Sequence, residues 1–154
     1  MDPGLFDKRL VIVTGKGGVG KSTVAAALAL VAARRGKRVL VCEVNAHERI
    51  APLLGAAPAG DTIREIEPNL FSVNVTPEAA MREYGLMVLR YRTIYNAVFE
   101  NRFVRYFLRV IPSLAELVML GKVLYEAREQ EDGKPRWDLV ILDAPATGHA
   151  VQFL

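Results

Sequence analysis

The sequence predicts an α/β fold with a doubly wound, mostly parallel sheet and helices on both faces. Two short runs rich in β-branched residues, Leu10–Thr14 and Val39–Glu43, have the composition of strands buried on both faces. A glycine-rich loop follows the first run, and Ser22–Arg35 then has the pattern of a helix. Strand, loop, helix and strand in this order make a βαβ unit, whose strands are parallel. A third run, Trp137–Asp143, predicts a buried strand that ends in an acid.

The next elements follow from caps and periodicity. Gly36 is expected to cap the first helix at its C-terminus, with cations beside it at the negative end of the dipole. The stretch 46–68 predicts short helices and loops, broken at GAAPAGDT. Leu70–Val75 alternates apolar and polar residues and therefore predicts a half-exposed strand. Its expected inner residues are Phe71, Val73 and Val75, and its expected outer residues are Ser72 and Asn74.

A helical block at residues 77–130 lies between two strands of the predicted sheet. Thr76 is expected as its N-cap, with Pro77 at the first helical position. A later helix should begin near Ser113, which has capping-box spacing to Glu116. Its expected apolar face comprises Leu114, Leu117, Val118, Leu124 and Tyr125, and EDGKP ends it. The block is longer than a crossover needs, so we interpret it as an insertion that caps the sheet.

Length and composition indicate one domain in a soluble cytoplasmic protein. The 154 residues suffice for a single core. No apolar run reaches the roughly 18–20 residues of a membrane span, and the N-terminus lacks the pattern of a secretory signal. The single cysteine, Cys42, excludes an internal disulfide and is expected to be a buried core thiol.

The glycine loop carries the chemistry. Residues 15–23, GKGGVGKST, satisfy G-x-x-x-x-G-K-[ST]. Such glycines let successive backbone N–H groups turn inward around phosphates at a helix N-terminus. Lys21 is expected to reach the β- and γ-phosphates of ATP, and the Ser22 hydroxyl to bind magnesium. Asp143 is expected to hold a water on that magnesium. The predicted nucleotide-binding residues are Gly15, Lys16, Gly17, Gly18, Val19, Gly20, Lys21, Ser22 and Thr23.

These motifs resemble a known family. The loop, with its additional Lys16, is similar to the deviant Walker A loop of the SIMIBI ATPases, which include MinD, ParA, the nitrogenase iron protein and ArsA. The segment DAPATGH at 143–149 resembles switch II of the ArsA group, which also includes the ATPase that targets tail-anchored membrane proteins. IPSLAEL at 111–117 and VNVTPEAAMREY at 73–84 are looser matches. The resemblance implies a magnesium-dependent ATPase of the P-loop fold, with switch II residues Asp143, Thr147, Gly148 and His149.

Lys16 is the residue that the resemblance makes most specific. In that family the early lysine reaches across a dimer interface to the partner's ATP. Carried onto Lys16, this implies a homodimer in the ATP state, in which a cation from the second subunit neutralises charge on the transferred phosphoryl group. The bland alternative is a solvated loop lysine.

Switch I departs from the family pattern. The family's aspartate that acts on the attacking water corresponds to Asn45 in CEVNAHE, and an amide orients water but does not take up its proton. Glu43 holds the first acidic position and is expected to act on the metal-bound water. We therefore predict slow hydrolysis. His47 and His149 have no partner at ligand spacing, so neither is expected to bind metal, and the cysteines by which some relatives bind arsenite have no counterpart.

The family carries further strands and adenine-holding residues beyond the point where this sequence stops. Residues 1–154 are therefore expected to be the N-terminal part of one P-loop ATPase domain, truncated after switch II. A missing C-terminal half or a second polypeptide would complete the sheet, whose unpaired edge favours association.

Three alternatives to an ATPase switch with an unknown client stay open. The domain could be a binding module of the MinD/ParA type with little turnover. The segment 82–109 holds six arginines and two glutamates, which could contact nucleic acid or an anionic membrane, or simply form a solvated basic face. A third alternative is an apolar client groove rather than core, formed by Tyr91, Tyr95, Phe99, Phe103, Tyr106, Phe107 and Leu108.

Overall fold

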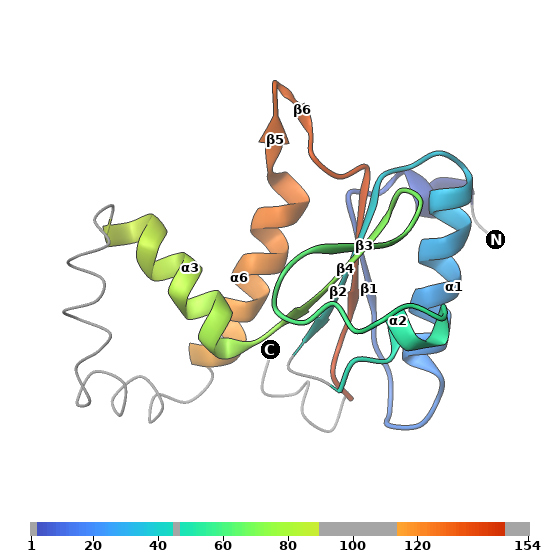
Figure 1. Ribbon diagram of the computed structural model, residues 1–154, viewed down its shortest axis with the longest axis horizontal. Coiled ribbons are helices and arrows are strands. Elements are labelled where there is room, and N and C mark those ends of the chain that lie inside the picture. Colours follow the sequence, from blue (N-terminus) through green and yellow to red (C-terminus); the bar gives the residue numbers. More distant parts are fainter. Residues whose placement is uncertain (1–2, 45–46, 90–113, 147–154) are drawn as a thin grey trace.

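A five-stranded sheet with helices on both faces forms the centre of the molecule (Figure 1). The computed structural model describes residues 3–44, 47–89 and 114–146. In sheet order the strands are β1 (Leu10–Val13), β7 (Leu139–Asp143), β2 (Val39–Val44), β4 (Leu70–Val75) and β3 (Arg64–Glu67). The first four run parallel and β3 runs antiparallel to β4. The predicted α/β fold with a mostly parallel sheet is confirmed.

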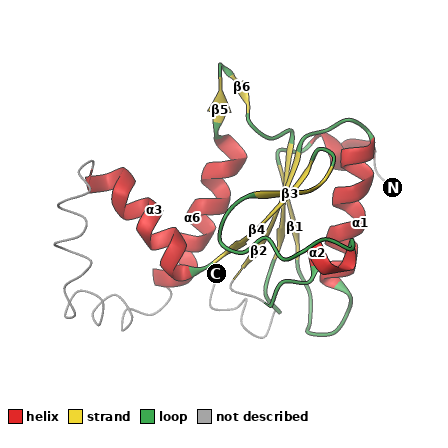
Figure 2. Ribbon diagram, viewed as in Figure 1, coloured by secondary structure: helices red, strands yellow, loops and turns green. Residues whose placement is uncertain are grey.

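Helices cover both faces of this sheet (Figure 2). Within the described residues, the helical segments are the 3-10 turn η1 (Pro3–Asp7) and the helices α1 (Lys21–Arg34), α2 (Ile50–Leu53), α3 (Pro77–Leu89) and α6 (Leu114–Arg128). One core lies between α1 and the face of the sheet that carries Val39, Val41 and Ile141. A second core lies on the opposite face, where α6 packs on residues such as Leu40 and Val140. The two cores make the sheet doubly wound.

Helix α1 packs on the sheet through alanine. Its buried residues are Ala25, Ala26, Ala29, Ala32 and Ala33, each no more than 5% exposed. The predicted C-terminal cap is confirmed: Gly36 has φ 82°, and its N–H donates to the carbonyl of Ala33. At the other end Gly20, with φ 86°, precedes the first helical residue.

Strand β1 lies at one edge of the sheet, so the prediction that it is buried on both faces was wrong. Within the described residues it pairs only with β7, and Ile12 is 51% exposed. A continuous apolar run indicates a buried strand, but it does not indicate whether that strand has a neighbour on each side in the sheet.

Strand β4 corrects a second prediction. Ser72 was expected to face solvent, yet it is fully buried, because β4 lies between β2 and β3 and both of its faces are covered. The Ser72 hydroxyl has no hydrogen-bond partner among the described residues. Strand β3 itself was not predicted; it falls within the stretch expected to hold short helices and loops.

The described part of the helical block begins and ends as predicted. The Thr76 hydroxyl accepts the Ala79 N–H at 3.3 Å and so caps α3. After α6, a tight turn through Asp132 and Gly133 joins the short strands β5 (Gln130–Glu131) and β6 (Lys134–Pro135). No helix in the described ranges is long and apolar enough to cross a membrane.

The predicted apolar face of α6 was wrong for Leu117, Leu124 and Tyr125, although Val118 packs partly against the core. The residues it buries are Met119, Val123, Glu126 and Ala127, whereas Leu117 is 66% and Tyr125 48% exposed. Periodicity alone allowed either face, since α6 carries apolar residues nearly all round.

A buried carboxylate joins α6 to the start of β7. Glu126 is 1% exposed and accepts hydrogen bonds from Lys122 Nζ at 2.6 Å and from Trp137 Nε1 at 2.9 Å. Lys122 also forms an ion pair with Glu83 of α3. Burial alone would lower the pKa of Lys122, but its hydrogen bonds to Glu126 and Glu83 outweigh burial and raise it. The two helices and the sheet therefore share one ionic contact.

Candidate nucleotide-binding site

The glycine loop connects the carboxyl end of β1 to the N-terminus of α1, the place where parallel α/β sheets bind ligands. Gly18 and Gly20 have φ of 78° and 86°, a region that side chains with a Cβ rarely adopt. Lys21 folds back over the loop, and its Nζ donates to the carbonyl of Lys16 at 3.1 Å. The Lys16 residue itself is exposed.

Ser22 and Asp143 meet beneath the loop. Asp143 lies opposite Val13 in the β1–β7 register, so it lies beside the point where β1 ends and the loop begins. The Ser22 hydroxyl donates to Asp143 Oδ2 at 2.6 Å. Asp143 is 9% exposed, and its Oδ1 is buried without a hydrogen-bond partner among the described residues. An unpaired carboxylate oxygen beside a hydroxyl is a donor set that suits magnesium, so these residues fit the ion that the motif implies.

A cavity of about 510 Å³ opens beside the loop. The loop and the start of α1 contribute Gly18, Gly20, Lys21, Ser22 and Thr23 to its lining. The other described residues of its lining come from the segment that follows β2, namely Glu48, Arg49, Pro52 and Leu53. Sequence analysis missed this second part. The signal that could have identified this part of the lining is the polar segment that directly follows β2, the strand beside β7.

Glu43 is the last residue but one of β2, and it anchors this second segment. It is 1% exposed, and its Oε1 accepts the Arg49 N–H at 2.8 Å while Oε2 lies 3.4 Å from the Ile50 nitrogen. Burial raises the pKa of Glu43; these two backbone hydrogen bonds lower it in part, and the charges of Asp143 and Glu48 raise it further. The predicted action of Glu43 on a metal-bound water stays a prediction. Both of its oxygens already accept backbone hydrogen bonds.

Glu48 fastens the same segment to the following loop. Its two carboxylate oxygens accept the N–H groups of Ala59 and Gly60 at 2.5 and 2.8 Å. Two carboxylates thus hold the cavity wall formed by residues 48–53: Glu43 of β2 and Glu48 of the wall itself.

Several predicted site residues lie outside the described residues: Asn45, Thr147, Gly148 and His149. Of the others, Gly17 approaches the segment after β7, since a Cβ placed on it would lie 3.8 Å from the Ala146 Cβ. Val19 is 62% exposed at the tip of the loop. Cys42 is buried as predicted, and burial raises the pKa of its thiol.

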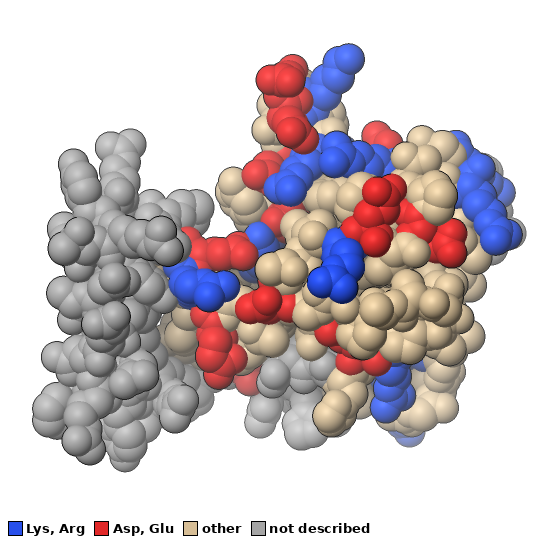
Figure 3. Space-filling model, viewed as in Figure 1, with Lys and Arg blue, Asp and Glu red and all other residues tan. Residues whose placement is uncertain are grey.

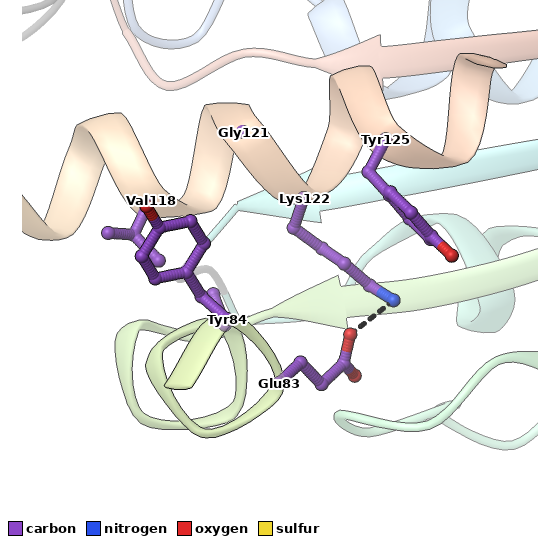
Figure 4. A pocket seen from close by; sticks show the side chains of 7 residues that line it. Glu83, Tyr84, Val118, Gly121, Lys122 and Tyr125 are labelled. Atoms are coloured by element: carbon purple, nitrogen blue, oxygen red, sulfur yellow. Dashed lines mark ion pairs between the residues drawn. The ribbon is translucent and has the colours of Figure 1, made fainter. Parts of the chain in front are cut away.

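A second cavity, of about 190 Å³, lies between α3 and α6 (Figure 4). Tyr84 and Val118 border it at one end and Tyr125 at the other, with the Glu83–Lys122 ion pair beside them. The arginines and aromatic residues at 90–109 proposed for a client, membrane or nucleic acid lie outside the described residues. On the face in Figure 3, basic and acidic side chains of the described residues are interspersed.

The strand, glycine loop and helix, with Lys21 and Ser22 at the helix start and an acid from the neighbouring strand, define a P-loop nucleotide-binding fold. Within that class, a profile of the anion-transporting ATPase family matches residues 8–154, so the chain belongs to this family. The resemblance noted from the loop and switch II is confirmed.

The chain is also similar to three named relatives. It is 34% identical over 154 residues to ATPase BagA of Mycobacterium tuberculosis, a match that covers 95% of the chain and 45% of that protein. To ATPase GET3 of Kluyveromyces lactis it is 26% identical over 155 residues, covering 95% and 44%. To the arsenical pump-driving ATPase of Acidiphilium multivorum it is 37% identical over 78 residues, covering 49% and 13%. The chain spans less than half the length of these relatives.

Proposed function

We propose that this chain is the nucleotide-binding part of an ATPase that binds Mg·ATP, hydrolyses it slowly and dimerises in the ATP state. The observation that carries the proposal is the contact of Ser22 with Asp143 beneath the glycine loop, with Asp143 Oδ1 buried and unpaired. The cavity of about 510 Å³ beside them is large enough for the phosphates and part of the nucleoside.

The loop residues have distinct tasks. The backbone N–H groups of residues 15–23 bind the phosphate oxygens at the positive end of α1. Lys21 exchanges its hydrogen bond with the Lys16 carbonyl for the β- and γ-phosphates, which adds positive charge where the leaving group forms. Magnesium, when bound, neutralises phosphate charge, and Ser22 and Asp143 are the residues that hold it, Asp143 through water.

Lys16 acts on the partner's nucleotide. Its residue is exposed on the loop, and its carbonyl, not its ammonium, accepts the bond from Lys21. The side chain is therefore free of that internal contact and can cross to the partner's nucleotide. There it neutralises the charge that develops on the transferred phosphoryl group.

Hydrolysis is slow because Asn45 orients the attacking water but does not accept its proton. Glu43 contributes by holding the segment that follows Asn45. The same proposal includes a cytoplasmic location and a client that is not identified. It also includes a further polypeptide or C-terminal half that completes the sheet.

The alternative is a binding module of the MinD/ParA type with little turnover. Asn45 favours it over a fast enzyme. This alternative includes contact with an anionic membrane or nucleic acid through the segment 82–109, because that segment is rich in arginine.

Sedimentation velocity with Mg·ATP or a non-hydrolysable analogue tests the proposal. The wild-type chain should bind nucleotide and shift to a dimer, Lys16→Ala should bind but fail to dimerise, and Lys134→Ala, on the distant β5–β6 hairpin, should behave as wild type. Binding without dimerisation would contradict the ATP-state dimer and leave nucleotide binding standing. No binding of nucleotide by the wild-type chain would contradict both functions.

A further inference from the structure

The cavity beside the glycine loop contains a cation that the loop motif does not include. Arg49 directly precedes α2 and lines this cavity together with Lys21, Ser22 and Thr23. The Arg49 residue is exposed, and it forms no ion pair with any carboxylate in the described ranges. An arginine without an ion pair in the described chain therefore lines the cavity, next to Glu48, whose carboxylate accepts backbone hydrogen bonds.

The backbone that carries Arg49 is fixed on both sides. The buried Glu43 accepts the Arg49 N–H at 2.8 Å. The preceding residue, Glu48, accepts the N–H groups of Ala59 and Gly60. An arginine on an anchored backbone loses less conformational freedom when it binds a ligand than one on a loose loop, so more of its interaction is available for affinity.

We propose that Arg49 binds the polyphosphate of the nucleotide held by Lys21 and Ser22 of the same chain. A planar guanidinium presents parallel N–H donors that match two phosphate oxygens, and this pairing is stronger than that of neutral groups. The inference rests on the proposed function, because it needs a nucleotide in this cavity. The proposed role differs from that of Lys16, because Arg49 acts within one subunit. Removing Arg49 should weaken nucleotide binding even where no dimer forms.

The test is a displacement titration on the intact chain. Fluorescent N-methylanthraniloyl-ATP with Mg²⁺ is bound first and then displaced by ATP or by tripolyphosphate, which has no nucleoside. Arg49→Ala should weaken both competitors by on the order of tenfold, the usual effect of losing a hydrogen bond to a charged group. Arg49→Lys keeps the charge and should recover part of the affinity.

Arg128→Ala is the matched control. Arg128 is exposed in the last turn of α6, which lies at the amino end of β1, where Arg9 donates to the Ala127 carbonyl. The glycine loop follows the carboxyl end of β1, so Arg128→Ala removes the same charge far from the cavity and should bind as wild type.

The outcomes separate this inference from the function on which it rests. If wild type binds ATP and Arg49→Ala binds equally well, the Arg49 contact is refuted and the ATPase proposal stands. If Arg49→Ala weakens ATP but not tripolyphosphate, the guanidinium contacts the nucleoside and the phosphate assignment is wrong. If the wild-type chain binds neither ligand, both fail together. Thermal unfolding of each variant establishes that it is folded before it is compared.

Discussion

At the scale of single residues, Asp143 connects the sheet to the candidate chemistry. One of its oxygens accepts the Ser22 hydroxyl, and the other is buried without a described partner. A buried carboxylate oxygen is costly to leave unpaired, so its position is explained when a cation or a water on that cation shares the site.

Asp143→Asn should lower the affinity of the nucleotide site for Mg²⁺ by about 10- to 100-fold, the usual cost of losing a group that orients a metal's ligands. ATP binding should therefore need higher Mg²⁺ concentrations in the variant. The measurement is ATP affinity across a range of Mg²⁺ concentrations. Asp138→Asn is the control: Asp138 precedes β7 at its other end, where it accepts the Arg38 N–H at 2.7 Å. Equal Mg²⁺ dependence in the two variants would contradict the assignment.

Glu43 predicts a dependence of stability on pH. Its pKa is raised above the ordinary 4.5, chiefly by burial and further by the Asp143 charge. Between 4.5 and the raised value the folded chain holds a proton that the unfolded chain has released. The contribution of Glu43 to stability is therefore most favourable below 4.5 and falls as pH rises through the raised pKa.

Urea unfolding of wild type and Glu43→Gln at several pH values from about 4 to 8 measures this contribution. The free energy of unfolding of wild type should fall relative to the variant as pH rises. A difference between the two proteins that stays constant over this range would show that the Glu43 carboxyl does not titrate with a raised pKa.

Sequence reasoning at this scale identified residue types but not their contacts. It found Glu43 as an acid at the end of β2, yet the hydrogen bonds to Arg49 and Ile50 depend on how the chain turns after the strand. The position of Arg49 in the cavity depends on that same turn, so no local pattern could give it.

At the scale of elements, the pair α3 and α6 is tied to the sheet by Glu126. The Lys122 ammonium lies between Glu126 and Glu83, and Trp137 donates to the other Glu126 oxygen. Arg136 lies 3.8 Å from that second oxygen. The buried charge is stable where it is because all these donors surround it.

Lys122→Met should destabilise the chain by about 2 kcal/mol, less than the loss for a fully buried pair, because Lys122 keeps some exposure. Urea unfolding measures the loss. Lys134→Met, an exposed lysine of the hairpin, is the control and should change stability little. A Lys122→Met chain as stable as wild type would mean that Trp137 and Arg136 alone satisfy Glu126.

Element boundaries were predicted well where a local signal sets them. Thr76 and Pro77 start α3, and Gly36 ends α1, because caps act within one turn. The buried face of α6 was wrong for the opposite reason. Which side of a helix is buried depends on the sheet beneath it, and Met119, Val123 and Ala127 face that sheet at a spacing that other apolar residues also satisfy.

At the scale of the whole molecule, the order of the strands positions the site. Strand β7 lies between β1 and β2, so Asp143 has Val13 on one side and Glu43 on the other. The glycine loop and the segment after β2 therefore meet over the end of β7, although they are separated in the sequence.

The sequence predicted the class of fold and the parallel βαβ unit, because a buried strand followed by a glycine loop permits few other arrangements. It did not predict that β1 lies at an edge or that β3 pairs with β4. Those facts depend on which strands are neighbours in space. In the described residues, β1 pairs only with β7, and its Ile12 is 51% exposed.

The alanine face of α1 has a consequence for the glycine loop. Five methyl groups set the spacing between helix and sheet close to its minimum, and the glycine loop is attached to the first turn of that helix. A larger residue at any of the five would lift the helix and move the loop with it. The geometry of the glycine loop therefore depends on five small side chains that contact no ligand themselves.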